Sequence, residues 1–461
     1  MVLALLAAFA IERSSIKCKP LFTILFTMPM LIPSISHAFG IVQLFGNNGL
    51  ITRLLGLENG AYGFVGIVLG SIAYSFPVAF LMFSSILHFE DGSAYRAADV
   101  LGIPKYKQFL SITLPYMKKT LISCFFAVFT MIVTDYGVPL MVGGKTVTLS
   151  VLMFNRAVSM IDYDSGSVIG AILLIPAVVA FLVDFFNKDN GQSSFITESA
   201  QLRGGPCLLP AYCYCILLCL CVLAPVVSFC FMFLETKYPV NREFTVSHVI
   251  RTINRGAGTY LLNSVIYAVL SAISGTVFAF CCSYLTARVK NTYSKILHLI
   301  SITSMAIPGI VLGLSYVIFF HNTPVYSTAI IVVLANMIHF FSSPYLMMYN
   351  TLGKVNMNLE SVGMILGIGR LRIVFDVIVP KVRCTLFEMF GYFFVNSMMT
   401  ISAVAFLAPP SPKPVALMIN QFEAQRLMES AAFVSLLILA VNLFMKGVII
   451  LLEKRDVLKT S

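Results

Sequence analysis

The segment Gly143-Gly144-Lys145-Thr146 is the one stretch of this sequence that is similar to the end of a phosphate-binding loop, which would bind a nucleotide. Such a loop follows a strand and needs another glycine five residues before its last one. Pro139 stands at that position, and no strand is expected ahead of it. The complete G-x-x-x-x-G-K-[ST] pattern therefore occurs nowhere in the chain, and the sequence predicts no ATP-hydrolysing site and no enzyme.

Histidine and cysteine, the common metal ligands and nucleophiles, lack the spacing that those chemistries need. The 6 histidines are scattered, and no Ser-His-Asp or paired-carboxylate arrangement is evident. Six of the 11 cysteines fall on one apolar stretch, where cysteine packs as a small hydrophobic side chain; they are Cys207, Cys213, Cys215, Cys219, Cys221 and Cys230. We therefore expect neither a metal site nor a structural disulfide.

Composition places the chain in a membrane. Hydrophobic residues make up 58% of it and charged residues 11%, and the mean hydropathy is +0.90, beyond the range of a soluble domain. Runs long enough to cross about 30 Å of hydrocarbon predict spans at 21–45, 61–87, 120–142, 166–186, 207–234, 259–285, 295–320, 325–350, 384–408 and 430–452. An eleventh run, Met1 to Ile11, is too short to span, and we expect the natural start to lie upstream of it. A signal peptide is disfavoured because no basic residue precedes this run.

Topology explains the net charge of +11. If the spans alternate, most lysines and arginines fall on one side, which also holds the C-terminus. Cytoplasmic loops of membrane proteins carry this excess of positive charge. The sequence therefore predicts a multi-pass protein of the cell inner membrane with a cytoplasmic C-terminus, and the basic residues give no reason to expect nucleic-acid binding.

Two of the predicted cytoplasmic loops have the same spacing of glycine and proline. Gly102 is followed by Leu114-Pro115 and Gly367 by Val379-Pro380, with thirteen positions from the glycine to the proline in both loops. We expect the glycine to end a short helix at a positive φ and the proline to open the next membrane helix, where its missing N–H costs nothing. Each loop is therefore predicted to be a rigid helix–turn–helix.

The residues ahead of each glycine differ between the loops. The first loop has Arg96-Ala97-Ala98, whose small alanines permit close docking in a partner's groove. The second is degenerate, with Ser361-Val362-Gly363 at the same place and Glu360 one position early. Two copies of one loop between matching membrane helices indicate an internal repeat and favour a transporter.

The duplicated loop resembles the "EAA" coupling loop of ABC importer permeases. The stretches Thr134-Asp135-Tyr136-Gly137-Val138-Pro139 and Met398-Met399-Thr400-Ile401-Ser402-Ala403-Val404 resemble helix ends of fused two-domain permeases of the ferric-iron importer family. The resemblance covers nearly the whole chain. Permeases for 2-aminoethylphosphonate, thiamine and polyamines share much of this pattern. The departures are Arg96 and Ser361, where the family usually has glutamate, and the missing first span.

The resemblance implies an all-α polytopic membrane protein made of two homologous type I ABC importer transmembrane domains of the MetI-like kind, in a parallel pseudo-twofold arrangement. It implies a non-catalytic permease for ferric iron, with substrate supplied by a periplasmic or lipid-anchored binding protein. A dimer of separate ATPase subunits would bind the ATP, so no cofactor belongs to this chain, whose other surroundings are membrane lipid. The alternatives are a permease for 2-aminoethylphosphonate, thiamine or a polyamine, or a secondary transporter.

The resemblance also implies which residues meet the ATPase. They are Arg96, Ala97, Ala98, Gly102, Pro115, Glu360, Ser361, Gly363, Gly367 and Pro380. Polar side chains inside membrane spans are costly and are candidates for a translocation path. Asp135 with Tyr136, and Thr400 with Ser402, hold corresponding places in the two halves and are our candidates. The alternative for Asp135 is that its carboxylate is merely solvated at the membrane–water interface and has no part in translocation.

Two halves of the chain align on two landmarks. Ile32-Pro33 and Ile307-Pro308 differ by 275 positions, and the loop glycines by 265. Both loops are predicted on the cytoplasmic side, so the halves run in the same direction, unlike the inverted repeats of secondary transporters. We expect a first permease domain over 1–186, with its N-terminal span truncated, a cytoplasmic linker over 187–206 and a second permease domain over 207–461.

Overall fold

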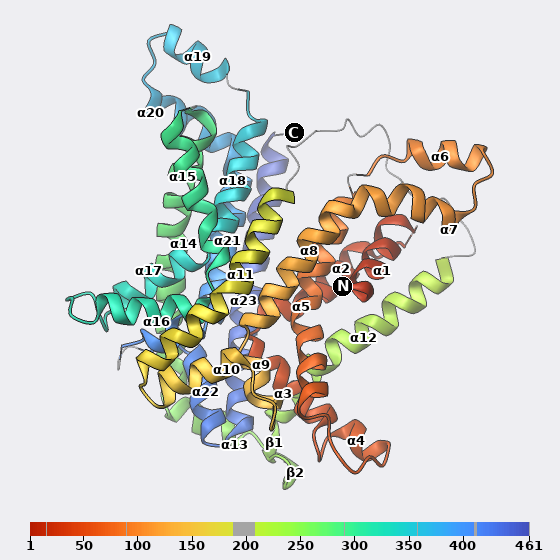
Figure 1. Ribbon diagram of the computed structural model, residues 1–461, viewed down its shortest axis with the longest axis vertical. Coiled ribbons are helices and arrows are strands. Elements are labelled where there is room, and N and C mark those ends of the chain that lie inside the picture. The colour runs from red at the N-terminus through yellow and green to blue at the C-terminus, as the bar shows by residue number, and fades with distance from the viewer. Residues whose placement is uncertain are drawn as a thin grey trace. The chain divides into compact units, whose positions relative to one another are not determined.

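The computed structural model describes residues 1–14, 16–88, 90–187, 208–289, 291–356, 358–409 and 413–460. In these ranges the chain is helical apart from its connections and one hairpin, formed by β1 (Glu235–Lys237) and β2 (Asn241–Phe244) (Figure 1). The expected all-α class is confirmed. The expected linker at 187–206 lies, after its first residue, outside the described residues.

The chain divides into two compact units. Unit 1 comprises Met1–Leu152 and Ile175–Glu243, and unit 2 comprises Met153–Leu174 and Phe244–Ser461. Helix α12 (Leu208–Met232), which opens the predicted second permease domain, belongs to unit 1. The compact units and the predicted sequence halves are therefore different divisions of the chain.

Unit 1 packs aromatic side chains between closely spaced helices. Its elements are α1 (Val2–Arg13), α2 (Lys19–Thr27), η1 (Met28–Leu31), α3 (Ser34–Phe45), α4 (Leu50–Leu54), α5 (Phe64–His88), α6 (Ser93–Val100), α7 (Lys105–Gln108), η2 (Phe109–Thr113), α8 (Leu114–Thr134), α9 (Gly137–Val142), α12 and the hairpin as far as Glu243. Helices α10 (Leu149–Phe154) and α11 (Tyr163–Asn187) cross the boundary between the units, and η3 (Asn155–Ser159), between them in the chain, lies in unit 2. Phe26 lies edge-on to Phe80, with ring centroids 5.2 Å apart. Close helix contact of this kind replaces the hydrophobic effect as the stabilising force inside a bilayer.

Small residues set the spacing of α3 and α12. A Cβ added to Gly40 of α3 would lie 2.6 Å from the Cα of Pro225 on α12. The Ser228 hydroxyl donates a hydrogen bond across the same contact, to the Gly40 carbonyl at 3.1 Å. Glycine lets the two backbones approach, and the hydroxyl then gains an interhelical bond. Helix α12 is therefore fixed to unit 1 by backbone contact.

Unit 2 is built around α14 (Ala257–Arg288), which packs against α15, α17, α18 and α21. Its further elements are α13 (Ser247–Asn254), α15 (Thr292–Thr303), η4 (Ser304–Ala306), α16 (Gly309–Phe320), α17 (Ala329–His339), α18 (Ser342–Lys354), α19 (Asn358–Ile365), α20 (Arg370–Ile373), η5 (Val374–Ile378), α21 (Val379–Met399), η6 (Val404–Phe406), α22 (Ala416–Ala424) and α23 (Met428–Thr460). Gly275 gives α14 and α21 room, since its Cβ would lie 2.8 Å from the Phe393 ring.

The structure corrects the prediction of ten continuous spans. Its described residues include 6 helices long and apolar enough to cross a membrane, or up to 9 if each bent helix pair counts as one span. The predicted span 384–408 is not among them, and α21, which covers its first part, ends at Met399. Spans 21–45 and 295–320 are bent, by 103° and 109°.

Both bends occur at a landmark of the sequence alignment. The breaks fall at Pro33 and Pro308, which come directly before α3 and α16. Proline has no N–H to donate to the preceding turn, and it pushes the residue before it out of helical conformation. Ile32 and Ile307 are accordingly extended, with ψ of 150° and 114°. The two bends are equivalent features of the two halves.

Candidate functional site

Both predicted loops fold into the same succession of elements, which we call the first loop segment (residues 93–115) and the second loop segment (residues 358–380). Each has an eight-residue helix, a glycine turn, a four-residue helix and a five-residue π-helical turn, and leads into a 21-residue helix. These elements are α6, α7, η2 and α8 in the first, and α19, α20, η5 and α21 in the second (Figure 1).

The glycine turn is the same in both loop segments. Gly102 has φ +68° and Gly367 has φ +71°. The Ile103 N–H bonds the Ala98 carbonyl, and the Ile368 N–H bonds the Gly363 carbonyl, at 2.9 Å in both cases. This is the hydrogen bond of a Schellman motif, which needs a left-handed residue where glycine alone has no steric penalty. The expected positive φ is present at both positions.

The prolines also hold equivalent places. Pro115 and Pro380 are each the second residue of a 21-residue helix. A proline there leaves the carbonyl four residues earlier without its usual N–H donor, and those carbonyls, of Ser111 and Asp376, lie within the π-helical turns. π-Helical turns are rare in proteins, and those that do occur often lie at functional sites. The start of α8 and the start of α21 therefore carry the same local departure from regular α-helix.

Each loop segment closes its inner face differently. Ala98 is buried at 4% exposure, and at the matching position a Cβ on Gly363 would collide with the Ile373 side chain, whose Cγ1 would lie 2.9 Å away. In the first loop segment the Gln108 amide donates to Asp99 Oδ1 at 2.6 Å and to the Ile103 carbonyl at 2.7 Å. The turn is therefore stabilised by an amide in one copy and by an isoleucine in the other.

Asp99 is the acidic centre of the first turn. Lys105 Nζ lies 2.6 Å from its Oδ1, and the Gln108 amide also donates to it. The hydrogen bonds from Lys105 and then from Gln108 lower the pKa of Asp99 below its usual value. The carboxylate is charged at neutral pH and is used within the loop.

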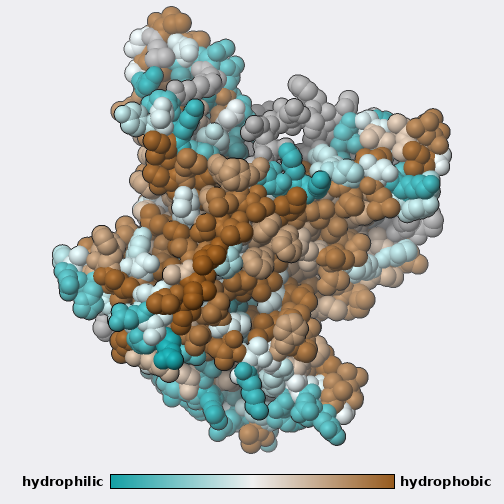
Figure 2. Space-filling view, in the orientation of Figure 1, coloured by the Kyte–Doolittle hydropathy of each residue, from teal (hydrophilic) through white to brown (hydrophobic). Residues whose placement is uncertain are grey.

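The outer tip of each loop segment presents apolar side chains. Val100 and Leu101 are 88% and 75% exposed, and the equivalent Ile365 and Leu366 are 84% and 69% exposed. Figure 2 shows hydrophobic colouring at the tips of both segments. Exposed apolar groups next to a rigid turn indicate a docking surface. Arg96, Ala97 and Ser361, predicted to meet a partner, are exposed as well.

Glu360 does not lie on that exposed surface. The Tyr284 hydroxyl donates a hydrogen bond to its Oε1 at 2.9 Å, and Arg288 Nε lies 3.7 Å from the same oxygen. Of the residues that we predicted to meet a partner, Glu360 therefore contacts α14 of its own chain. Sequence spacing could not show this, because the orientation depends on a residue 72 positions away.

Asp135 acts as a cap in unit 1. Its carboxylate accepts hydrogen bonds from the N–H groups of Gly137 and Val138, at 3.2 and 3.0 Å, where α9 begins. Its main-chain carbonyl accepts a bond from the Ser150 hydroxyl at 2.6 Å. The neighbouring Tyr136 is buried. These contacts give Asp135 a structural task, and a place on a translocation path stays a prediction.

The corresponding residues of unit 2 also make local contacts. Thr400 donates from its hydroxyl to the Asn396 carbonyl at 2.7 Å. Ser402 Oγ would lie 2.6 Å from a Cβ on Gly309. In unit 1 the same close approach joins Gly137 to the Ser34 hydroxyl. Serine and glycine have thus changed places between the halves, a pairing that the sequence alignment showed only after the contact was known.

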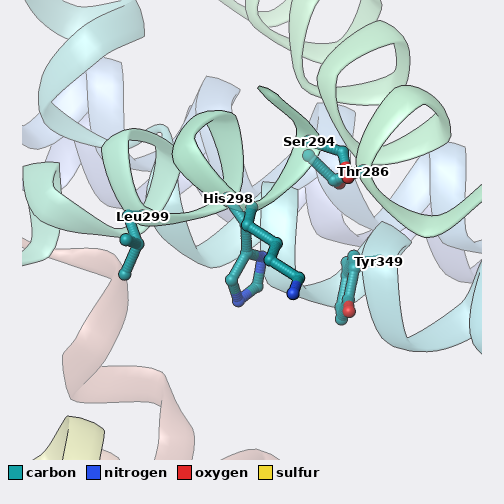
Figure 3. A pocket seen from close by; sticks show the side chains of 6 residues that line it. Thr286, Ser294, His298, Leu299 and Tyr349 are labelled. Atoms are coloured by element: carbon teal, nitrogen blue, oxygen red, sulfur yellow. The ribbon is translucent and has the colours of Figure 1, made fainter. Parts of the chain in front are cut away.

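A pocket of about 260 Å³ lies in unit 2, lined by Thr286, Ser294, Lys295, His298, Leu299 and Tyr349. Figure 3 shows the His298 side chain, from α15, near that of Tyr349, from α18, and their ring centroids are 4.7 Å apart. His298 Nδ1 lies 2.7 Å from the Tyr345 hydroxyl, which donates to Thr286 at 2.8 Å. His298 and Thr286 are thus linked through Tyr345. The described residues contain no cluster of three or more metal-ligating His, Cys, Asp or Glu side chains.

Comparison with known proteins adds a family match. The family described as binding-protein-dependent transport system inner membrane component matches residues 1–188 and 275–455, and each matched stretch contains one loop segment. A ferric transport system permease protein of Actinobacillus pleuropneumoniae is 25% identical over 96% of this chain and 68% of its own length.

Two further relatives cover different shares of the chain. A Haemophilus influenzae protein provisionally named as a ferric transport system permease is 26% identical over 87% of this chain and 66% of its own length. A thiamine transport system permease protein of Brucella abortus is 26% identical over 28% of this chain and 25% of its own length. The chain spans about two thirds of the length of the two ferric permease relatives.

Proposed function

Because the chain belongs to the family of binding-protein-dependent transport system inner membrane components, we propose that it is the permease subunit of an ATP-driven ABC importer. Substrate arrives at the outer face on a periplasmic or lipid-anchored binding protein. A dimer of ATPase subunits docks from the cytoplasm, one subunit on each loop segment. The duplicated loop segment carries this proposal, because a dimer of like subunits needs two like docking surfaces.

The geometry of the tips supports docking into a groove. A short helix with apolar side chains at its end binds by inserting them into an apolar groove. Val100 and Leu101 in one copy, and Ile365 and Leu366 in the other, have that form and stand at matching positions. The charge differs, since Arg96 aligns with Ser361. We expect an acidic or neutral ATPase surface opposite Arg96.

Ferric iron is the substrate that we propose. Two relatives that cover most of this chain carry ferric transport in their names, whereas the thiamine relative covers 28% of it. Hard cations prefer oxygen ligands. Asp135 and Thr400 are oxygen-bearing residues that directly follow α8 and α21, and Ser402 lies two residues after Thr400. A permease need only let the cargo pass, so the binding protein supplies the affinity.

Uptake in a strain that lacks this permease tests the substrate. Cells complemented with the chain, its ATPase and its binding protein are given labelled ferric iron, 2-aminoethylphosphonate or thiamine. We expect iron uptake to be restored and the other two to be unaffected. Restored phosphonate or thiamine uptake with unchanged iron uptake would replace iron and keep the importer class.

A second arm tests the class itself. The complex is reconstituted in proteoliposomes with ATP or a non-hydrolysable analogue. Uptake that needs ATP hydrolysis and an associated ATPase supports the importer. Uptake that persists without the ATPase would identify a secondary transporter.

A further inference from the structure

A buried arginine holds the start of the first loop segment. Arg13, the last residue of α1, pairs through Nη2 with Glu90 Oε2, and the two side chains are only 3% and 4% exposed. The Arg13 guanidinium also lies 4.9 Å from the centroid of the Tyr95 ring. The Tyr95 hydroxyl donates to Glu90 Oε1 at 2.6 Å and lies 2.6 Å from Thr113 Oγ1. These contacts join α1 to α6 and to the π-helical turn.

A second arginine does the same in unit 2. Arg288 is the last residue of α14, and its side chain is 4% exposed. Its Nε lies 3.7 Å from Glu360 Oε1 on α19, which also accepts the hydrogen bond from Tyr284 at 2.9 Å. The end of α14 is thereby joined to the helix of the second loop segment.

The two arginines correspond, but their partners do not. The offset of 275 that aligns the bends also aligns Arg13 with Arg288. Their acids come from different places, since Glu360 aligns with Tyr95 at the loop offset of 265. Arginine, glutamate and tyrosine are therefore assembled twice from partly different positions. The shared feature is the linkage itself, from the helix that precedes the bent run (α1 or α14) to the helix of the loop segment.

Stability alone does not account for such a linkage. The free-energy cost of removing two charges from water offsets most of their attraction. Apolar side chains of similar size would stabilise the fold at least as well. In unit 1 the Arg13 guanidinium donates to Glu90, and a planar guanidinium bonded to a carboxylate fixes direction because its donors have a set geometry. In unit 2 the Tyr284 hydroxyl supplies the directional hydrogen bond to Glu360, and Arg288 adds the opposite charge at 3.7 Å. The linkages thus hold the orientation of α6 against α1 and of α19 against α14.

We propose that Arg13 and Arg288 are positioning residues for energy coupling. Each makes the helix of its loop segment move as one body with the helix that precedes the bent run, α1 in unit 1 and α14 in unit 2, so that closure of the ATPase dimer moves that helix. The inference rests on the proposed function and adds to it the residues that carry the movement. Neither arginine touches the ATPase or the substrate in this scheme.

The test compares coupling in the complete complex of permease, ATPase and binding protein in proteoliposomes. The variants are Arg13→Gln and Arg288→Gln. Arg255→Gln is the matched control, because Arg255 is an exposed arginine of unit 2, outside the loop segments, whose Nη1 donates to Gln425 at 3.0 Å. We expect stimulation of ATP hydrolysis by the loaded binding protein to fall on the order of tenfold in both variants. Basal hydrolysis and the amount of bound ATPase should stay near the unmodified level.

Charge exchange makes the result specific. Arg288→Glu combined with Glu360→Arg, and Arg13→Glu combined with Glu90→Arg, should restore part of the stimulation that each single exchange removes. Hydrogen exchange on the detergent-solubilised permease gives a readout that needs no ATPase. We expect faster exchange in residues 358–365 of Arg288→Gln and unchanged exchange there in Arg255→Gln. If the glutamine variants do not insert, Arg13→Lys and Arg288→Lys, which keep the charge and lose the planar geometry, take their place.

Two results would overturn the proposal. One is unchanged stimulation in both arginine variants. The other is a loss of inserted protein with a normal ratio of transport to ATP hydrolysis in the part that inserts, which would show a purely structural role. A complex without ATP-dependent uptake even in its unmodified form would instead refute the proposed function, and faster exchange in residues 358–365 would still support the linkage.

Discussion

At residue scale, Gly102 and Gly367 are required by their backbone alone. A Cβ at either position would meet nothing within 4 Å, so steric contact places no demand for glycine there. Their φ values of +68° and +71° are strained for a β-branched residue. We expect Gly102→Val and Gly367→Val each to cost about 1–3 kcal/mol, to weaken ATPase association and to leave insertion intact. Thermal unfolding and copurification of the ATPase measure these effects.

Gly369 supplies the control for this prediction. It lies in the same turn, and a Cβ added to it would likewise meet nothing within 4 Å, but its φ is −63°. Gly369→Ala should therefore behave like the unmodified protein. Equal losses in Gly369→Ala and Gly367→Val would show that side-chain volume, and not φ, decides the outcome.

Asp135 gives a second prediction at this scale. Its carboxylate caps the N–H groups of Gly137 and Val138, so Asp135→Ala should lower the free energy of unfolding by about 0.5–2 kcal/mol. Asp135→Asn keeps an acceptor oxygen and should lose less. The midpoint of thermal unfolding is measured beside the KM for iron uptake. A raised KM with an unchanged midpoint would instead place Asp135 on the translocation path.

Residue type and spacing predicted the glycines and prolines of the loops, because these residues act through their own backbone. They did not predict the inward orientation of Glu360 or the pairing of Arg13 with Glu90. Those depend on which side chains meet after folding, across 72 and 77 positions. A buried ion pair leaves no local periodic signal in a sequence.

At element scale, Gly363 shows how the second loop segment packs its two short helices. A Cβ there would meet only the Ile373 side chain, and Ile373 is 3% exposed. We expect Gly363→Ala to cost about 1–3 kcal/mol by overpacking. Ile373→Ala should remove that obstruction, so the double variant should be more stable than the sum of the single effects predicts. Unfolding midpoints of the four proteins form the cycle.

Ala98 is the internal comparison for this packing. The first loop segment has alanine at the position of Gly363, and Gln108 at that of Ile373. Gly363→Ala with Ile373→Gln copies the first arrangement into the second segment. Additive effects in the double-mutant cycle would show that packing against α20 does not require glycine at position 363.

Hydropathy predicted where the spans lie better than how they run. The runs 21–45 and 295–320 contain enough apolar residues to cross a bilayer, and composition does not show a break within them. Pro33 and Pro308 served as alignment landmarks, yet each also removes one N–H donor and bends its run by more than 100°. A bend of this size changes the path of the chain without changing its average hydropathy.

At the scale of the whole molecule, the internal repeat predicts an order of structural features that composition alone cannot predict. The two family-matched stretches each hold a bend, an arginine before it and a loop segment after it. The order of these features along the chain could be predicted, since it follows from local residues. The membership of α12 in unit 1 could not, because it depends on Gly40 meeting Pro225, 185 positions further on.

Sidedness is the prediction that distinguishes parallel from inverted halves. Cysteines are introduced into a cysteine-free variant at Ser93, Ser361 and Glu58, which are all exposed, and after the C-terminal Ser461. The excess of lysine and arginine places Ser93, Ser361 and the C-terminal position on the cytoplasmic side and Glu58 on the outside. A membrane-impermeant maleimide should therefore label Glu58→Cys in intact cells and the other three only after permeabilisation. Labelling of Ser93→Cys and Ser361→Cys from opposite sides would show inverted halves, as in secondary transporters, and a single ATPase dimer could not then reach both loop segments.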